Sequence, residues 1–342
     1  MGPGRETRAG SGDGSRAGSP GEALAVNVAG SERAAGWCVV GSGGRGARTP
    51  PSPTADRPLL HHRLFGLLEA ARTLVLVAES FHHQRCVLKV EAFLHARAGG
   101  ERRHLLCSAA TDGSIAFWDI TSPITDAVDA LHRAEEEMQP LGGCSCQQLL
   151  CLLREGHAGG SSASSDQGEH RSPDRACFPA LGTPLLTIMA HSCGVNSLHV
   201  CETPEGQYLV ASGSDDGSIH VCLLEVALGK GEAAAGTCLR ILERVARPCA
   251  HAAHVTGIRV LRPDLLLSAS VDQRLTLWRR GPGGLEALST TFFHVPDLAE
   301  VDCWEVGEAG GELHYYCVLC GQGLEMLRGM APPETPPQQG PH

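Results

Sequence analysis

One short phrase, written three times along the chain, constrains the fold more than any other feature of the sequence. Each copy has a Ser four residues before an Asp and then enters a β-rich run. The copies are Ser108 to Asp112, Ser212 to Asp216 and Ser268 to Asp272. Trp118 and Trp278 stand six residues after the Asp in the first and third copies, and Cys222 takes that place in the second. Such recurrence indicates a repeat architecture.

The phrase predicts two neighbouring β-strands joined by a tight turn. Asp112-Gly113 and Asp216-Gly217 are Asp-Gly pairs, which hairpin turns favour. The apolar residues Ile115 and Phe117 alternate with smaller ones, which is the period of a half-buried strand. Ala-His pairs ending at His191 and His254 precede the second and third copies, but no histidine stands at the expected distance before the first.

This combination resembles the WD40 repeat, whose blades are four-stranded antiparallel sheets of roughly 40 to 45 residues. In that family the His, Ser, Asp and Trp of one blade form a buried hydrogen-bonded chain. The resemblance implies a complete set in the third copy and incomplete sets in the other two. The expected members are His254, Ser268, Asp272 and Trp278, then His191, Ser212 and Asp216, then Ser108, Asp112 and Trp118.

The same residue types also occur in the nucleophilic triad of serine hydrolases. A triad is a single constellation with its own oxyanion donors, whereas this trio recurs along the chain. No Gly-rich loop follows a strand, and strands do not alternate with helices as in nucleotide-binding folds. We therefore predict no catalytic and no cofactor-binding residues.

We expect an all-β chain that forms a partial WD40 β-propeller. It should contain about three recognisable blades, one degenerate blade beginning at His294 and a leading half-blade. Residues 1–58 are rich in Gly, Arg, Ser and Pro and should be disordered, with Trp37 to Val40 as a stray strand. Blades should span 59–330, interrupted by a flexible insertion at 122–182, and 331–342 should be a disordered tail.

Cysteine and histidine raise the question of metal binding. The 15 cysteines are odd in number and scattered, which favours free thiols in a reducing compartment, with the cytoplasm as first choice and the nucleus as second. One cluster suggests zinc, namely Cys144, Cys146, Cys151 and His157. Its C-x-C spacing is tight and it has no second paired knuckle, so we predict no metal. The His61-His62 and His82-His83 pairs are interpreted as surface or loop histidines.

Over about residues 59–328 the chain is similar to the C-terminal part of a family of large multi-propeller WD-repeat proteins. The resemblance rests on seven segments: Leu74 to His95, Leu106 to Ile120, Ala190 to Ser197, Cys249 to Thr256, Ser268 to Trp278, Phe293 to Pro296 and Gly321 to Glu325. It implies a non-catalytic partner of the FtsJ-type tRNA ribose methyltransferase, which positions the tRNA anticodon loop for 2′-O-methylation of the wobble nucleotide. Residues 1–58 and the insertion depart from the family.

Two other readings stay open. A generic WD40 module for protein–protein interaction needs only the repeat, and a hydrolase or metalloprotein is the third hypothesis. The net charge of −10 argues against binding nucleic acid by bulk electrostatics. A local basic strip remains possible, although exposed arginines usually form salt bridges. Its members would be Arg97, Arg102, Arg103, Arg259, Arg262, Arg274, Arg279 and Arg280.

Overall fold

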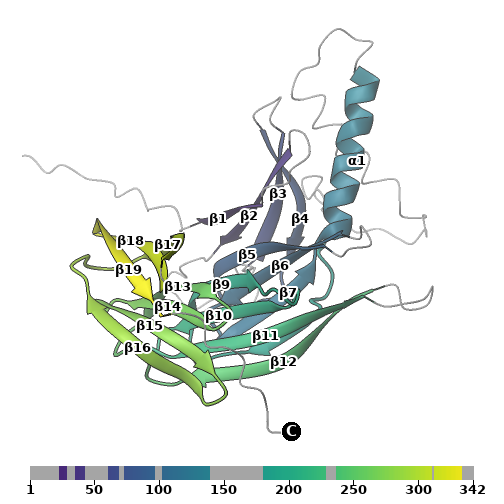
Figure 1. Cartoon of the computed structure of the whole chain (residues 1–342). Helices are drawn as coiled ribbons and strands as arrows, with labels where there is room; N and C mark the ends of the chain where they lie inside the picture. The colour runs from purple at the N-terminus through teal and green to yellow at the C-terminus, as the bar shows by residue number, and fades with distance from the viewer. Residues whose placement is uncertain are drawn as a thin grey trace, which may run out of the picture.

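The computed structural model describes residues 23–28, 35–42, 61–68, 73–96, 102–138, 180–228, 236–309 and 312–332. In these ranges the chain forms nineteen strands and one helix. The strands build four four-stranded sheets and one three-stranded sheet, each from consecutive antiparallel strands. Figure 1 shows them side by side as the blades of a partial β-propeller, which confirms the expected all-β fold.

The first two sheets hold their strands in chain order. Sheet 1 contains β1 (Ala23–Val28), β2 (Ala35–Ser42), β3 (His61–Leu68) and β4 (Thr73–Ser80). Sheet 2 contains β5 (Val87–Ala96), β6 (Arg102–Ala110), β7 (Ser114–Asp119) and β8 (Leu186–Met189).

The remaining three sheets follow in chain order. Sheet 3 contains β9 (Val195–Glu202), β10 (Tyr208–Ser214), β11 (Ile219–Leu228) and β12 (Thr237–Arg247). Sheet 4 contains β13 (Val255–Arg262), β14 (Leu265–Ser270), β15 (Arg274–Gly281) and β16 (Gly284–Phe292). Sheet 5 contains β17 (Glu300–Ala309), β18 (Glu312–Gly321) and β19 (Gly323–Ala331).

Sheet 1 corrects the expectation of a leading half-blade, because it has four strands. Both added strands lie inside 1–58, where we expected disorder apart from a stray strand at Trp37 to Val40. The apolar island Trp37 to Val40 is the centre of β2, and β1 pairs with it from Ala23↔Ser42 to Val28↔Trp37. Composition averaged over the whole segment does not reveal these two short strands. The backbone N–H and C=O groups of each are satisfied only when the strands pair. The rest of 1–58 lies outside the described residues.

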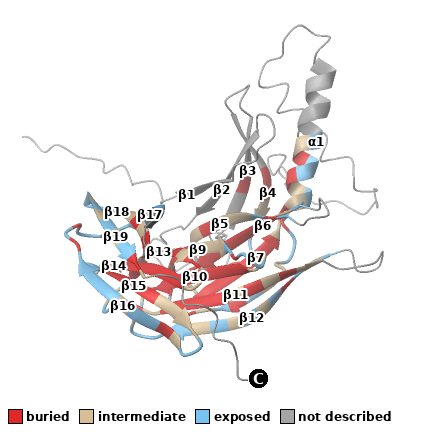
Figure 2. Ribbon diagram, in the orientation of Figure 1, coloured by how far each residue is buried: buried red, intermediate tan, exposed pale blue. Residues whose placement is uncertain are grey.

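The core lies between successive sheets. The second strands β10 and β14 are buried along their whole length, because a propeller blade packs on both faces. One apolar cluster joins sheets 2 and 3, another joins sheets 3 and 4, and a third joins sheets 4 and 5. Figure 2 shows this burial concentrated in the middle strands of the blades. The strands β5, β9, β13 and β17 lie next to one another in that order on the inner side.

The insertion after β7 begins with a helix, α1 (Thr121–Met138). Asp119 accepts a hydrogen bond from the Thr121 amide at 2.9 Å, which supports the first turn. Ile124 and Ala127 are buried in the cluster that joins sheets 1 and 2. The amphipathic stretch expected from Ile124 to Met138 is therefore this helix. Within the described ranges no helix has the length and apolar character needed to cross a bilayer.

Candidate functional site

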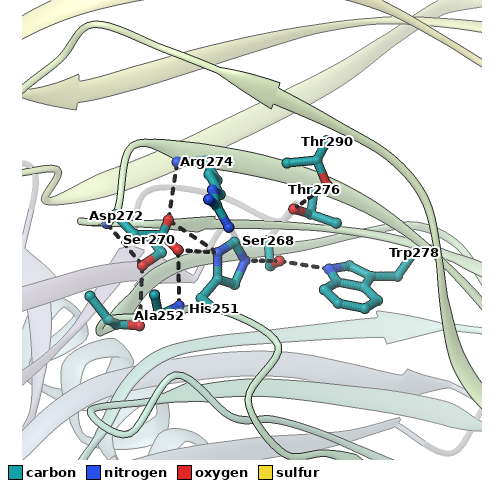
Figure 3. Close-up of polar contacts among 10 residues, drawn as sticks. His251, Ala252, Ser268, Ser270, Asp272, Arg274, Thr276, Trp278 and Thr290 are labelled. Atoms are coloured by element: carbon teal, nitrogen blue, oxygen red, sulfur yellow. Dashed lines mark hydrogen bonds and ion pairs between the residues drawn. The ribbon is translucent and has the colours of Figure 1, made fainter.

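The most complete polar constellation lies in sheet 4 (Figure 3). Trp278 Nε1 donates to Ser268 Oγ at 2.7 Å, and His251 Nε2 lies 2.6 Å from the same oxygen. His251 Nδ1 lies 3.3 Å from each carboxylate oxygen of Asp272. Because a carboxylate only accepts, Nδ1 carries the proton and Nε2 accepts from the serine hydroxyl. Indole, hydroxyl, imidazole and carboxylate thus form one directed chain.

The histidine of this chain is His251, and the assignment of His254 was wrong. His254 is exposed, and its Nδ1 forms an ion pair with Asp215 Oδ1 in the sheet 3 turn at 3.1 Å. Two Ala-His pairs stand three residues apart, and the sequence pattern alone does not separate them. The backbone does, because the His251 amide donates to the Gly217 carbonyl at 3.0 Å, as the His191 amide donates to Gly113 at 3.2 Å.

Those two glycines are required where the sheets meet. Gly113 and Gly217 have φ angles of 83° and 79°, in the left-handed region that favours glycine. A Cβ on Gly217 would lie 2.3 Å from the His251 carbonyl oxygen, and one on Gly113 would lie 2.2 Å from that of His191. The Asp-Gly pairs therefore serve two purposes, since they turn the hairpin and let the next histidine approach.

In sheet 3 a second serine stands between the histidine and the aspartate. His191 Nε2 lies 2.9 Å from Ser212 Oγ, and its Nδ1 lies 2.8 Å from Ser218 Oγ. Asp216 Oδ1 accepts from the Ser218 amide at 2.9 Å. The expected trio is thus brought together, with Asp216 connected to the histidine through Ser218. Cys222 is buried at the position that Trp278 occupies in sheet 4.

Sheet 2 contains a histidine that the sequence analysis missed. His83 Nε2 lies 2.5 Å from Ser108 Oγ, and its Nδ1 lies 3.1 Å from Ser114 Oγ. Ser114 Oγ donates to Asp112 Oδ1 at 2.5 Å, and the rings of His83 and Trp118 meet edge to face at 5.8 Å. The interpretation of His83 as a loop or surface histidine was wrong, whereas its neighbour His82 is exposed.

Spacing explains why His83 was missed. The histidine precedes the serine by 25 residues in sheet 2, by 21 in sheet 3 and by 17 in sheet 4. These intervals cross loops of different length, whereas the interval from Ser to Asp lies within one hairpin and is always four. In all three sheets the histidine stands four residues before the first strand begins, at Val87, Val195 and Val255. A search for a histidine at that distance before a strand would have found His83.

Sheet 5 replaces the polar set with apolar residues. The Phe293 amide donates to the Gln273 carbonyl at 3.1 Å, which is the backbone contact that the histidines make in sheets 3 and 4. Phe293 is buried, and so is Leu319 in the middle strand, at the place of the serine. The hairpin is also tighter, with Gly321 paired to Gly323, whereas Ala269 pairs with Leu275 in sheet 4. This sheet is the degenerate blade expected from His294 onward.

Comparison with known proteins identifies the repeating unit. Residues 182–222 match the family described as WD domain, G-beta repeat. This segment, from β8 into β11, is a WD40 repeat. Residues of this chain are 46% identical over 270 positions to the "tRNA (34-2'-O)-methyltransferase regulator WDR6" of Rattus norvegicus. The proteins of the same name from Mus musculus and Homo sapiens are each 45% identical over 269 positions.

These matches cover 77% of this chain and 20% of each relative, so the chain spans about a fifth of the length of the curated relatives it matches. Among solved structures, the chain is similar to Chaetomium thermophilum Sqt1 bound to the N-terminus of the ribosomal protein L10. That likeness has a TM-score of 0.41 at 14% identity and covers 86% of this chain and 59% of the other.

The WD40 networks are built for structure. Burial lowers the pKa of His83 and of His191 to about 4, and burial also lowers the pKa of His251. At neutral pH these imidazoles are uncharged and fully engaged in hydrogen bonds. Ser268 is completely buried and already receives the Trp278 indole. A nucleophile must meet its substrate, so this geometry favours the structural interpretation of the His-Ser-Asp trio over the triad.

A second polar group lies on the inner strands of the WD40 blades. Arg259 Nε of β13 lies 3.1 Å from Asp302 Oδ1, and its Nη1 lies 3.6 Å from Glu300 Oε1, both on β17. Lys89 of β5 also pairs with Glu300, which connects sheet 2 to sheet 5. Burial is the main cause that raises the pKa of the nearby Glu91 carboxyl to about 8. The Arg259 pairs thus join neighbouring sheets 4 and 5, and the Lys89 pair joins sheets 2 and 5, which are not neighbours.

Most of the described arginines considered for a basic strip are ion-paired, as the salt-bridge interpretation predicts. Ion pairs engage Arg103 with Asp119, Arg259 with Asp302, Arg262 with Asp264 and Arg280 with Glu243. Arg274 lies 5.4 Å from the centre of the Phe292 ring. Arg97 lies outside the described residues, and the structure assigns no such partner to Arg102 and Arg279 among those it describes. The salt-bridge interpretation therefore fits these arginines better than a free phosphate-binding strip.

Metal binding has no support in the described ranges, where no three His, Cys, Asp or Glu side chains gather closely enough to hold an ion. The cluster singled out for zinc, Cys144, Cys146, Cys151 and His157, lies outside those ranges.

Proposed function

We propose that this chain is a non-catalytic WD40 scaffold that supports 2′-O-methylation of nucleotide 34 in the tRNA anticodon loop by a partner methyltransferase of the FtsJ type. The observation that carries the proposal is the 45–46% identity over 77% of the chain to regulators named for that reaction. Identity at this level, spread over several blades, is far above what a shared propeller fold alone requires.

The scaffold would act by presenting rigid blade surfaces to the enzyme. In sheets 3 and 4 the buried polar networks fix the histidine whose amide binds the preceding blade, so the loops at those blade ends keep fixed positions. Such surfaces suit the binding of a protein partner, and tRNA would be engaged through the complex. The ion-paired arginines and the net charge of −10 support this indirect role over direct phosphate binding by this chain. We place this activity in the cytoplasm.

The test is co-expression of the chain with the FtsJ-type methyltransferase, followed by co-purification and mass spectrometry of cognate tRNA. We expect a stable complex that methylates the ribose of nucleotide 34, with no methylation by either protein alone. Raising the salt concentration should weaken tRNA binding by the complex much more than by the isolated chain. A folded chain that neither binds the enzyme nor supports methylation would overturn the proposal.

A general protein-interaction module is the second candidate, and one observation favours it. The face of sheet 5 that points away from sheet 4 exposes Trp304, Leu324, Met326 and Met330. Exposed apolar patches of this kind mark interaction surfaces in many soluble proteins. Binding to other proteins without any effect on tRNA methylation would select this candidate.

A further inference from the structure

Two cysteines of sheet 5 lie directly opposite each other on neighbouring strands. Cys303 of β17 pairs with Cys317 of β18, and Cys303 Sγ donates a hydrogen bond to Cys317 Sγ at 2.8 Å. Both side chains face sheet 4, where Cys317 is buried in the apolar cluster and Cys303 packs against it with part of its surface exposed. The two thiols are therefore held in contact by the register of the sheet.

This arrangement meets the geometric needs of a disulfide. Directly opposite residues in antiparallel strands have Cα atoms about 4.5 or 5.5 Å apart, and disulfides join Cα atoms about 4.4 to 6.8 Å apart. The sulfur atoms need to approach by only about 0.8 Å to reach the covalent length near 2.05 Å. No other pair among the ten described cysteines shows a sulfur–sulfur hydrogen bond.

The nearest cysteine in sequence is placed differently. Cys320 lies three residues beyond Cys317 on the same strand, so its side chain points to the opposite face of sheet 5. It is exposed, and it stands opposite Leu324 rather than another cysteine. Cys320 is thus a matched control, since it shares the strand and the blade but lacks a thiol partner across the ladder.

We propose that Cys303 and Cys317 form a reversible disulfide when the chain meets a small-molecule disulfide oxidant such as oxidised glutathione. The partly exposed Cys303 loses its proton to solvent and attacks one oxidant sulfur, which breaks the oxidant's S–S bond and releases one glutathione thiolate. Cys317 then loses its proton and attacks the Cys303 sulfur, which releases the second glutathione. Two protein thiols are oxidised by two electrons, and one oxidant disulfide is reduced to two thiols.

The consequence of the bond is a covalent tie between β17 and β18. Strand β17 carries Glu300 and Asp302, which pair with Arg259 and Lys89 of other blades. Oxidation would therefore hold β17, and with it the carboxylates of these inner ion pairs, in a fixed position. The hydrogen bond to Cys317 and burial both raise the pKa of the Cys303 thiol, so its thiolate is scarce and oxidation is slow at neutral pH.

The first experiment treats the whole chain with oxidised glutathione and maps the products by mass spectrometry. Trypsin leaves both cysteines in the peptide from 281 to 328, so a second cleavage after Glu305, Glu308 or Glu312 is needed to separate them. We expect the two fragments to stay joined, with the mass of two lost hydrogens, and to separate after reduction by dithiothreitol. Fragments that separate without reduction, or a bond that involves Cys320, would overturn the proposal.

The second experiment measures amide hydrogen exchange across residues 300–320 before and after oxidation. Closing a short loop disfavours local opening, so exchange in this segment should slow by about tenfold or more. The Cys320→Ser variant should show the same slowing, whereas Cys303→Ser should show none. Equal exchange of the oxidised and reduced wild-type chain would contradict the tie between the strands.

Discussion

Sheets 4 and 5 connect to their preceding blades through the same backbone contact but with opposite side-chain chemistry. In sheet 4 the amide of His251 binds the Gly217 carbonyl, and its imidazole continues into Ser268 and Asp272. In sheet 5 the amide of Phe293 binds the Gln273 carbonyl, and its ring enters an apolar cluster with Leu319. We call this backbone hydrogen bond, with the side chains buried around it, the joint between two blades. The joint depends on the backbone, and its buried side chains need only suitable partners, either hydrogen bonds or apolar contacts, among themselves.

The largest effect should come from placing a serine in the apolar joint. Leu319→Ser removes buried methyl groups and adds a hydroxyl opposite Phe293, which offers no hydrogen bond, so we expect a loss of about 3 to 5 kcal/mol. Denaturant unfolding followed by circular dichroism measures it. Leu324→Ser, on the exposed face of the same sheet, is the matched control and should change stability little. Similar losses for both variants would mean that the joint is not apolar in character.

The second prediction is that acid weakens the buried polar network of sheet 3 through His191. The folded pKa of His191, about 4, is below the unfolded value of 6.5, so the unfolded state binds the proton first as pH falls. The stability that depends on a neutral His191 is therefore complete above pH 6.5. It is lost as the pH falls from 6.5 to 4. We expect the wild-type chain to lose about 3 kcal/mol more over that range than a His191→Gln variant.

Denaturant unfolding at pH 7, 5.5 and 4.5 measures this difference. Glu91, whose pKa is raised to about 8, acts in the opposite direction, because its stability cost grows as pH rises from about 4.5 to 8. It is present in both proteins and cancels from their difference. Parallel pH profiles for the wild-type and variant chains would show that His191 is not held neutral.

The third prediction tests the centre of the polar joint. Ser268→Ala deprives both the Trp278 indole and the His251 imidazole of their buried partner, so we expect a loss of about 1 to 3 kcal/mol. Ser289→Ala, on the exposed outer strand of the same sheet, should lie within about 0.5 kcal/mol of wild type. Thermal unfolding of the two variants at pH 7 distinguishes them, and equal melting temperatures would remove Ser268 from the network.

The smallest effect should come from an ion pair on the outside of the blades. Arg240 pairs with Glu225 at 2.5 Å across β11 and β12, but its side chain is largely exposed. Arg240→Ala should therefore change the free energy of unfolding by less than about 0.5 kcal/mol, and high salt should reduce that further. A larger loss in denaturant unfolding would indicate that the outer strands contribute to the joints between blades.

The sequence predicted what a single hairpin determines. Ser and Asp are four residues apart in every copy because one strand and its turn fix that distance. The histidines come from the connections between sheets, whose lengths vary, and so His83 was missed and His254 was chosen over His251. Strand β1 was missed, and β2 was expected only as a stray strand at Trp37 to Val40, for another reason. Their runs are short, and only pairing with each other and with β3 shows that they are strands.

The backbone contacts from His191 and His251 to the turns before them also set an order of events. A blade emerging during synthesis can place its histidine only after the Asp-Gly turn of its predecessor has formed. Assembly should therefore run from the first blade to the last, as the chain is made. Nascent chains from which β15 has left the ribosome should already hold His251 against Gly217, before sheet 5 has folded.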